Sequence, residues 1–358
     1  MFDDPSPTTV STSSEDLVSR ETVEGGTPIA LFRCHSADID PMNWARTNKE
    51  HLLVELREYG AVLFRGFGVD SIAGLREFAM VFTPQLVPYL ERRSPRTELG
   101  QNIYTSTIHP ADQYIHFHNT TSFSHQWPLK LWFSCIHPAE WEGRTPISDI
   151  RVVLNRMDPK IRQKFEDLGV MYVSNYYEGM GLSWQTTFQT EDRPEVEAYC
   201  RGHGIDYEWI GGDRLRTKQV RHAVAIHPAT GERAWFNQAH HFHVTSLEPE
   251  VTKTLLATYR DEDLPRNSYY GDGSPIEQET LEHIAECYEA AKTDFLWEKG
   301  DVIMLDNMLV AHARTPYRGE RLIALALGEM YAGTYHGGGV ALTGSLTDSQ
   351  ESPIEGGD

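Results

Sequence analysis

Hydrophobic positions near the start of the chain predict two helices around one short strand. Residues 61–67 form an apolar run closed by glycines, which is typical of a buried strand. Just before it, residues 48–59 place Leu52, Leu53 and Leu56 at helical spacing, so a helix is expected there. A second helix is expected over 72–82.

The rest of the chain alternates apolar runs with amphipathic stretches. The expected strands are 129–136, 220–226, 235–236, 301–306 and 322–327, and the expected helices are 249–260 and 276–292. Many short strands with a few flanking helices favour a closed or sandwiched β core. The predicted fold class is therefore mostly β with flanking helices.

The two ends of the chain differ from its middle in composition. Residues 1–25 are rich in Ser, Thr, Pro and Glu, which cannot bury apolar surface, so a disordered N-terminal tail is expected. Residues 336–358 begin with a histidine and three glycines and are expected to form a flexible C-terminal tail. Between them, 26–335 contains no repeat and no evident linker, which predicts a single domain with insertions.

Charge and composition exclude several classes of protein. The 358 residues include 32 Lys and Arg against 52 Asp and Glu, a net charge of −20. Nucleic acid and membrane surfaces are therefore not expected partners, because both attract basic faces. No stretch is apolar enough to span a membrane, and the first residues do not resemble a secretory signal. The four cysteines are widely spaced without a CxxC motif, which favours reduced thiols and a cytoplasmic location.

Sixteen histidines make a metal site worth considering. Non-haem iron oxygenases hold their metal with two histidines and one carboxylate, and an H-x-D/E pair on a strand directs both side chains to one face. His118 and His312 are candidates, although the residues alone favour two unrelated histidines. His240-His241-x-His243 could form a second site if it lay on a strand, but a structural role is favoured there.

A series of motifs raises the case for His118 and His312. Together they span roughly residues 60–330 and resemble the iron(II)/2-oxoglutarate dioxygenases of the TauD/TfdA (clavaminate synthase-like) superfamily, most of all its SyrP-like branch. The matching segments are Tyr104-Thr105-Ser106, His118-Asn119 with Ser122-Phe123, Trp127-Pro128, Thr145-Pro146-Ile147-Ser148-Asp149, Gly181-Leu182-Ser183-Trp184-Gln185, His227-Pro228-Ala229-Thr230-Gly231, Trp235-Phe236-Asn237-Gln238, Tyr270-Gly271-Asp272-Gly273, Gly300-Asp301 and Asp306 to Arg314.

The resemblance implies a fold, a set of cofactors and several site residues. The fold would be a double-stranded β-helix, that is, a cupin-like jelly roll, and the cofactors would be Fe(II), 2-oxoglutarate and O2. His118 and His312 would be iron ligands. Thr145 and Arg321 would bind the far carboxylate of 2-oxoglutarate, since a guanidinium can hold a carboxylate through two hydrogen bonds. Arg314 would assist them, or would simply be structural.

The family's carboxylate ligand falls on Thr120, and no Asp or Glu stands at 119–122. Relatives that chlorinate have Ala or Gly at this position, where chloride binds the iron. Threonine is larger, and its hydroxyl could retain a water or leave room for halide. Three hypotheses follow: a halogenase, slightly favoured; a hydroxylase, desaturase or cyclase with a two-histidine iron; or a non-catalytic binding relative. An engineered substitution would also give this sequence. Arg144, where relatives usually have Glu, is interpreted as a harmless loop change.

The substrate is expected to be a small polar molecule related to an amino acid, and a free molecule is favoured over one tethered to a carrier protein. The candidate substrate-binding residues are Asn119, Arg96, Asn175, Gln185 and Asn237. Arg96 ends the densest basic patch in this acidic chain, for which a solvated loop is the favoured interpretation and capture of an anionic substrate group the alternative. No phosphate-binding loop, GxSxG motif or Cys–His pair supports a kinase or a hydrolase. The oligomeric state stays open.

Overall fold

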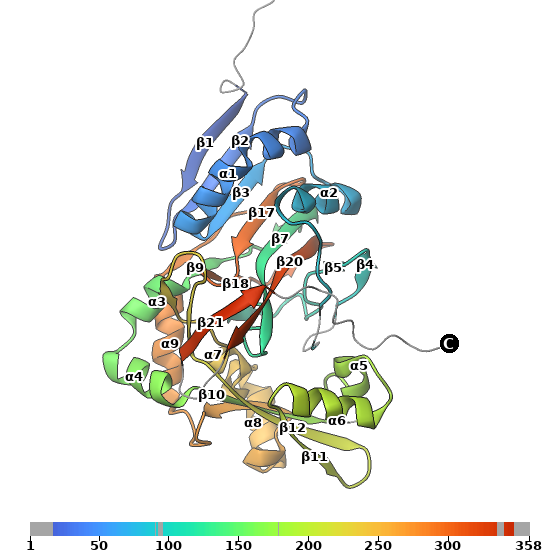
Figure 1. Ribbon diagram of the computed structural model, residues 1–358, viewed down its shortest axis with the longest axis vertical. Helices are drawn as coiled ribbons and strands as arrows, with labels where there is room; N and C mark the ends of the chain where they lie inside the picture. Colours follow the sequence, from blue (N-terminus) through green and yellow to red (C-terminus); the bar gives the residue numbers. More distant parts are fainter. Residues whose placement is uncertain (1–16, 90, 92–95, 178, 335–339, 347–358) are drawn as a thin grey trace, which may run out of the picture.

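The computed structural model describes residues 17–89, 91, 96–177, 179–334 and 340–346. Within these ranges a long twisted sheet runs through the centre of the molecule in the order β1-β2-β3-β17-β7-β20-β21-β13-β14, and β4 and β5 join it through β20 (Figure 1). Its strands are β1 (Val18–Val23), β2 (Ile29–Cys34), β3 (Ala61–Arg65), β4 (Glu98–Gly100), β5 (Ile103–Thr105), β7 (Gln126–His137), β13 (Val224–Ile226), β14 (Arg233–Ala234), β17 (Val302–Asp306), β20 (Leu322–Thr334) and β21 (Val340–Leu346).

A smaller sheet in the order β16-β9-β18-β6 packs against the central part of the long sheet. Apolar side chains from both sheets meet between them, including Leu131 and Phe133 from the long sheet and Ile147 and Val310 from the small one. The strands of the small sheet are β6 (Ile115–His118), β9 (Ile147–Asp149), β16 (Lys292–Thr293) and β18 (Val310–Arg314). This pair of sheets is the jelly-roll core, and it confirms the predicted mostly-β fold class.

Two further sheets extend the core. One lies at the opposite end of the molecule from β1 and β2, in the order β11-β12-β10-β15, and the other pairs β19 with β8 (Figure 1). Their strands are β8 (Trp141–Glu142), β10 (Val170–Tyr176), β11 (Asp206–Ile210), β12 (Arg214–Arg221), β15 (Arg266–Tyr270) and β19 (Tyr317–Arg318).

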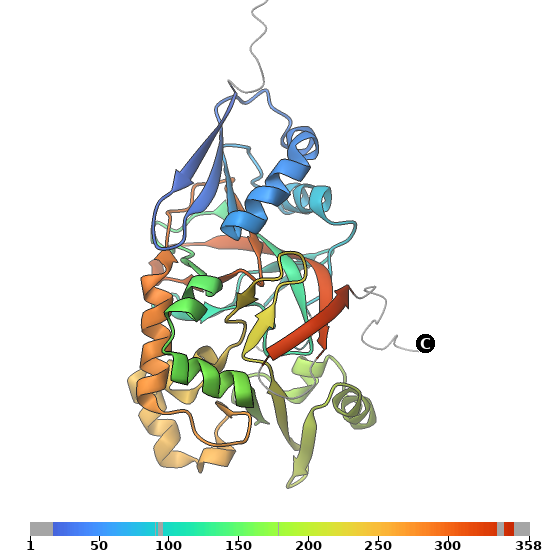
Figure 2. The same ribbon diagram turned by 60° about the vertical axis from the view of Figure 1, so that its left-hand side comes forward.

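Helices cover the outer faces of these sheets. α1 and α2 pack on one end of the long sheet, while α9 runs beside α3 along a flank (Figure 2). The helices are α1 (Pro41–Tyr59), α2 (Ile72–Phe82), α3 (Ile150–Arg156), α4 (Pro159–Leu168), α5 (Trp184–Phe188), α6 (Arg193–Gly202), α7 (Ala239–Phe242), α8 (Pro249–Thr258) and α9 (Gln278–Ala290), with short 3-10 turns at Val244–Ser246 and Asp261–Asp263.

Local sequence explains where α1 begins and ends. The Asp40 carboxylate accepts hydrogen bonds from the amides of Met42 and Asn43, and a proline fills the first helical position, so the helix begins earlier than its leucine spacing predicts. Gly60 ends the helix with φ +71°, and a Cβ there would lie 2.4 Å from the Val310 side chain. Glycine is therefore required by both backbone conformation and space.

Most predicted elements are confirmed, and the differences have clear causes. The helix over 72–82 and the strands within 61–67, 129–136, 301–306 and 322–327 are present, as are α8 and α9. The run 220–226 is split, because its first part pairs in the β10–β12 sheet and its second part in the long sheet. The expected strand at 235–236 falls just after β14.

Both expected tails are too long. Val18–Val23 form β1, which pairs antiparallel with β2, and Val340–Leu346 form β21 between β20 and β13. The remainder of both predicted tails lies outside the described residues, apart from Leu17 and residues 24–25, which flank β1. Among the helices of the described ranges, none combines the length and the apolar character needed to cross a membrane.

Candidate active site

The small sheet brings His118 and His312 side by side. β6 and β18 are antiparallel neighbours in which His312 lies directly opposite His118, and the two ring centroids are 4.4 Å apart. Phe133, from the facing strand β7, packs on His312 with 5.0 Å between ring centroids. Two histidines that are distant along the chain therefore share one site between the two sheets.

Burial holds both rings in the neutral form. Nδ1 of His118 donates to the carbonyl of His116 at 2.8 Å, which leaves the lone pair on Nε2. Burial lowers the pKa of His118 to about 4, and the nearby charge of Arg96 adds to this effect. Burial also lowers the pKa of His312 well below its usual range, assisted by His118 and Arg96. Neutral imidazoles are the form that binds metal.

Thr120 stands where a carboxylate ligand was expected. It is buried, it lines the same cavity as His118, and its hydroxyl oxygen has no hydrogen-bond partner. Its main chain is fixed by Asn307, whose Oδ1 accepts from the Thr120 amide at 2.8 Å and whose Nδ2 donates to the Thr120 carbonyl at 2.9 Å. Among the described residues, no three His, Cys, Asp or Glu side chains form a group that could hold a metal.

Thr145 and Arg321 line one narrow pocket with both histidines. Thr145 lies two residues before β9 and Arg321 directly before β20, so the two sheets place them at the same end of the core. The Thr145 hydroxyl accepts a hydrogen bond from Nε1 of Trp297 at 3.0 Å. Nε of Arg321 donates to the Gly143 carbonyl at 3.1 Å.

The charge of Arg321 is not balanced by a side chain. No described carboxylate is among the groups that influence Arg321, and burial, with help from Arg314, lowers its pKa to about 10. A buried guanidinium is costly without an anion. The pocket therefore fits a bound carboxylate such as that of 2-oxoglutarate.

Two further arginines, Arg314 in the lining of this pocket and Arg144 beside Thr145, have structural contacts. Arg314 also lines it, but its guanidinium donates to the carbonyls of His109 at 3.1 Å, Pro110 at 2.5 Å and Gln113 at 2.8 Å. These bonds hold the segment before β6. Arg144 forms ion pairs with Glu142 and Asp294, each at 2.8 Å, which agrees with its interpretation as a loop change.

A larger cavity of about 840 Å³ opens beside the histidine pair. Its lining includes His118, Thr120, Gln238 and His241, and Arg96 lines both this cavity and the narrow pocket. The size is sufficient for a substrate larger than a single amino acid. The cavity therefore gives access to the histidine pair.

The remaining predicted substrate residues lie away from this cavity or hold the main chain. Asn119 donates to the carbonyls of Asn307 at 2.7 Å and Val310 at 2.9 Å. The amides of Asn175 and Asn237 likewise donate to main-chain carbonyls. Neither these three residues nor Gln185, on α5, belong to the described lining of the cavity, so their proposed contact with substrate gains no support.

The triple-histidine segment does not form a second metal site in the described residues. Ala239–Phe242 is a short helix rather than a strand, so alternate residues do not share a face. His241 instead stacks on His118 with ring centroids 4.8 Å apart, and His240 lies against His116 at 5.2 Å. His241 thereby limits the movement of the His118 ring.

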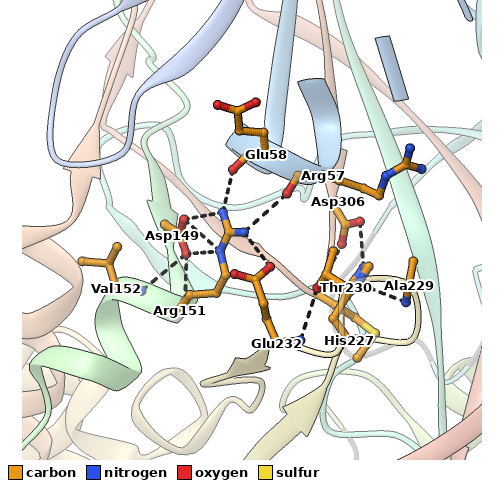
Figure 3. A network of polar contacts seen from close by, with 11 residues as sticks. Arg57, Glu58, Asp149, Arg151, Val152, His227, Ala229, Thr230, Glu232 and Asp306 are labelled. Atoms are coloured by element: carbon orange, nitrogen blue, oxygen red, sulfur yellow. Dashed lines mark hydrogen bonds and ion pairs between the residues drawn. The ribbon is translucent and has the colours of Figure 1, made fainter. Parts of the chain in front are cut away.

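A polar network braces the small sheet from behind (Figure 3). The Arg151 guanidinium forms ion pairs with Asp149 at 2.7 Å and Glu232 at 2.9 Å. Nearby, His227 accepts from two main-chain amides through Nδ1, so its Nε2 carries the proton that it donates to Asp306 at 3.0 Å. Asp306 in turn accepts from the Met308 amide in the turn that leads to His312.

Two residues of the site escaped sequence reasoning. Trp297 orients Thr145, and Asn307 fixes Thr120, although Asn307 was quoted in a family motif. Neither bond could be inferred from spacing, because each joins segments far apart in the chain. Asn307 offers one signal, since an amide beside a buried strand end commonly binds main-chain groups.

A jelly roll with neutral histidines between its sheets and an unbalanced arginine beside them is typical of non-haem iron oxygenases that use 2-oxoglutarate. The chain belongs to the TauD/TfdA family, since the family model described as "Taurine catabolism dioxygenase TauD, TfdA family" matches residues 28–327. It is a 2-oxoglutarate-dependent dioxygenase, as predicted, and its cofactors are Fe(II), 2-oxoglutarate and O2.

Individual relatives agree with this assignment. The chain is 40% identical over 272 residues to the dapdiamide synthesis protein DdaC of Enterobacter agglomerans, covering 76% of this chain and 83% of DdaC. It is 28% identical over 298 residues to a clavaminate synthase-like protein of Arabidopsis thaliana, covering 79% and 85% of the two chains. The fold is similar to that of PvcB from Pseudomonas aeruginosa, with a TM-score of 0.53, 13% identity and coverage of 90% and 95%.

Proposed function

We propose that this oxygenase serves a biosynthetic pathway and activates a C–H bond of a small polar substrate, with His118 and His312 holding the iron and halide beside Thr120. Thr145 and Arg321 would hold the far carboxylate of 2-oxoglutarate, which supplies two electrons for oxygen activation as it is converted to succinate and CO2. The similarity to DdaC, a dapdiamide synthesis protein, supports a biosynthetic role.

One observation carries the halogenation proposal. The hydroxyl of Thr120 is buried in the cavity with no partner, and the described residues offer no carboxylate in its place. A ferrous ion with two neutral histidines keeps more positive charge than one with a carboxylate ligand. An exogenous anion such as chloride is therefore more attractive there than in relatives that have a carboxylate.

The same hydroxyl supports a second candidate. An alcohol can hold a water molecule through one donated or accepted hydrogen bond. With water instead of halide beside the iron, the outcome would be hydroxylation, desaturation or ring formation. The two candidates differ in the ligand beside Thr120, not in the pocket of Thr145 and Arg321.

The decisive experiment is an anaerobic titration of the protein with Fe(II) and 2-oxoglutarate, followed by chloride. The visible iron-to-ketoacid charge-transfer band reports assembly of the site. Halogenation predicts that chloride shifts or strengthens the band in a saturable way for the natural sequence and for Thr120→Ala. Thr120→Glu is the matched control, because its carboxylate should occupy the position and remove the response.

Each result has a distinct meaning. A band that ignores chloride would contradict halogenation and favour the two-histidine oxygenase. Absence of the band in the natural sequence would contradict both and favour a binding protein. Tests with carrier-tethered and free amino-acid-like compounds then separate the two substrate forms.

A further inference from the structure

Arg96 has guanidinium nitrogens that lack a hydrogen-bond partner. Its Nε and Nη1 are buried and have no hydrogen-bond partner, and its guanidinium lies over the Tyr89 ring with 4.8 Å to the ring centroid. Arginine stays protonated in proteins, so it cannot relieve this cost by losing its proton. A buried donor without a partner in the folded chain is expected to meet a ligand instead.

The position of Arg96 defines where that ligand lies. It is among the residues that line the narrow pocket with His118 and His312, and also among those that line the larger cavity with Thr120. It therefore stands at the junction of the two spaces, beside the metal site. Contact with the Tyr89 face fixes the plane of the guanidinium, and Nε and Nη1 are left to donate to a ligand from two different edges of that plane.

The charges around the cavity select an anion. In a chain of net charge −20, the described lining of this cavity carries the arginines Arg96 and Arg266 and a single carboxylate, Glu248, which is exposed. The narrow pocket supplies Thr145 and Arg321 for the far carboxylate of 2-oxoglutarate. The anion at Arg96 is then not that far carboxylate.

We propose that Arg96 binds a carboxylate of the substrate, so that the natural substrate is a carboxylic acid that enters through the larger cavity and places its acid group beside the metal site. The inference rests on the proposed oxygenase function and specifies the substrate class. The buried nitrogens of Arg96 can donate to carboxylate oxygens from fixed positions in a planar, permanently charged group, which the single ammonium of a lysine could not reproduce. Oxidation would then fall on a carbon close to the carboxylate.

Propionate tests this inference without knowledge of the full substrate. In protein loaded with Mn(II) and 2-oxoglutarate, propionate bound at Arg96 should show saturable paramagnetic relaxation of its protons, measured by NMR. Propionamide, which has the same shape without the charge, should bind about 10-fold or more weakly. Arg96→Gln should weaken propionate by a similar factor, whereas Arg266→Gln, which alters the other cationic lining residue, should change it less than about 3-fold.

The controls distinguish the possible sources of the carboxylate. If Arg96 instead binds 2-oxoglutarate, Arg96→Gln will weaken 2-oxoglutarate binding and propionate will show relaxation only when 2-oxoglutarate is absent, which would overturn the inference. Equal binding of propionate and propionamide, or no relaxation by the loaded natural sequence, would also overturn it. Arg96→Lys should fall between the natural sequence and Arg96→Gln, and thermal unfolding of each variant checks its folding. The charge-transfer band with Fe(II) and 2-oxoglutarate is measured separately, so loss of the Arg96 inference leaves the proposed function standing.

Discussion

Two half-buried arginines, Arg151 and Arg321, have very different surroundings. Arg151 contacts two carboxylates and two main-chain carbonyls in the network of Figure 3. Burial lowers the pKa of Arg151, but Asp149 and Glu232 outweigh it and raise the pKa above its usual value. Arg321 donates to the main-chain carbonyl of Gly143, and burial lowers its pKa to about 10.

The comparison separates structural polar groups from ligand-binding ones. In the network behind the sheet, donors and acceptors are matched within the protein, and their removal should cost folding free energy. At the front of the sheet, the Thr120 hydroxyl, Nδ1 of His312 and two nitrogens of Arg96 are buried without partners. Buried polar groups without partners destabilise the folded chain when no ligand is bound. They therefore indicate where ligands supply the missing interactions.

The largest contrast is expected between two histidines, one from each region. Mutation of a residue that only supports a metal ligand typically lowers metal affinity by roughly 10–100-fold. His312→Gln removes a proposed ligand itself, so Mn(II) affinity should fall by more than this, and 2-oxoglutarate turnover should fall to background. His227→Gln should lower the free energy of unfolding by about 1–3 kcal/mol, because Asp306 loses its buried partner. Calorimetry with Mn(II) and urea unfolding measure both. Retained Mn(II) affinity in His312→Gln would contradict the assignment of the metal site.

Arg321→Met should produce the next largest effect. Loss of the guanidinium should weaken 2-oxoglutarate binding by about 2–5 kcal/mol, as for truncation of one partner of a buried charge pair. The unfolding free energy without ligand should stay equal or rise, because an unbalanced buried charge is removed. Calorimetry in the presence of Mn(II) and denaturant titration test the two parts. Arg321→Lys keeps the positive charge but not the paired hydrogen bonds of the guanidinium. It should lose less affinity for 2-oxoglutarate than Arg321→Met.

Local hydrophobic patterns in the sequence were sufficient to predict most helices and strands of the core. The helix at Ile72–Phe82 and the strand at Ala61–Arg65 have periodic or continuous apolar positions that any tertiary context would bury. β1 was missed because four of its six residues are polar, and β21 because glycine and polar residues interrupt its apolar positions. Both are stabilised by main-chain bonds to neighbouring strands, and such pairing leaves little trace in the side-chain pattern.

The site was predictable only in part, and for a similar reason. Family motifs identified His118, Thr120 and His312, whose spatial relation then follows from the pairing of β6 with β18. The predicted substrate contacts of Asn119 and Asn175 gain no support, because a buried amide that holds main chain and one that faces a substrate look alike in sequence. Partners at long sequence separation decide between them, and these become visible only in the folded chain.

Arg151→Met should reverse the pattern expected for Arg321→Met. The pair with Asp149 is mostly buried, so its loss should lower the unfolding free energy by about 3 kcal/mol, at the lower end for a broken buried pair. The dissociation constant of 2-oxoglutarate should change little. Adding Asp149→Asn to Arg151→Met should recover part of the loss, since the uncompensated charge is removed while Asn still caps α3. A tenfold loss of 2-oxoglutarate affinity in Arg151→Met would show that the network tunes the pocket as well as the fold.

The smallest expected change concerns pH. Protons compete with metal for an imidazole only when the pH approaches the pKa of the ligand-free protein. Burial lowers the pKa of His118 to about 4 and that of His312 well below its usual value. Mn(II) affinity should therefore be nearly constant from mildly acidic to mildly alkaline pH. It should fall only as the pH drops toward 4. If the two histidines were exposed, Mn(II) affinity would fall about tenfold for each ring with every pH unit below roughly 6.5. Arg96→Gln removes a cation that lowers the pKa of both histidines. The Mn(II) affinity of this variant should therefore begin to fall at a higher pH than that of the natural sequence. Calorimetric titrations across this range measure the onset, and a decline in the natural sequence near roughly 6.5 would mean that the histidines are solvated rather than held neutral between the sheets.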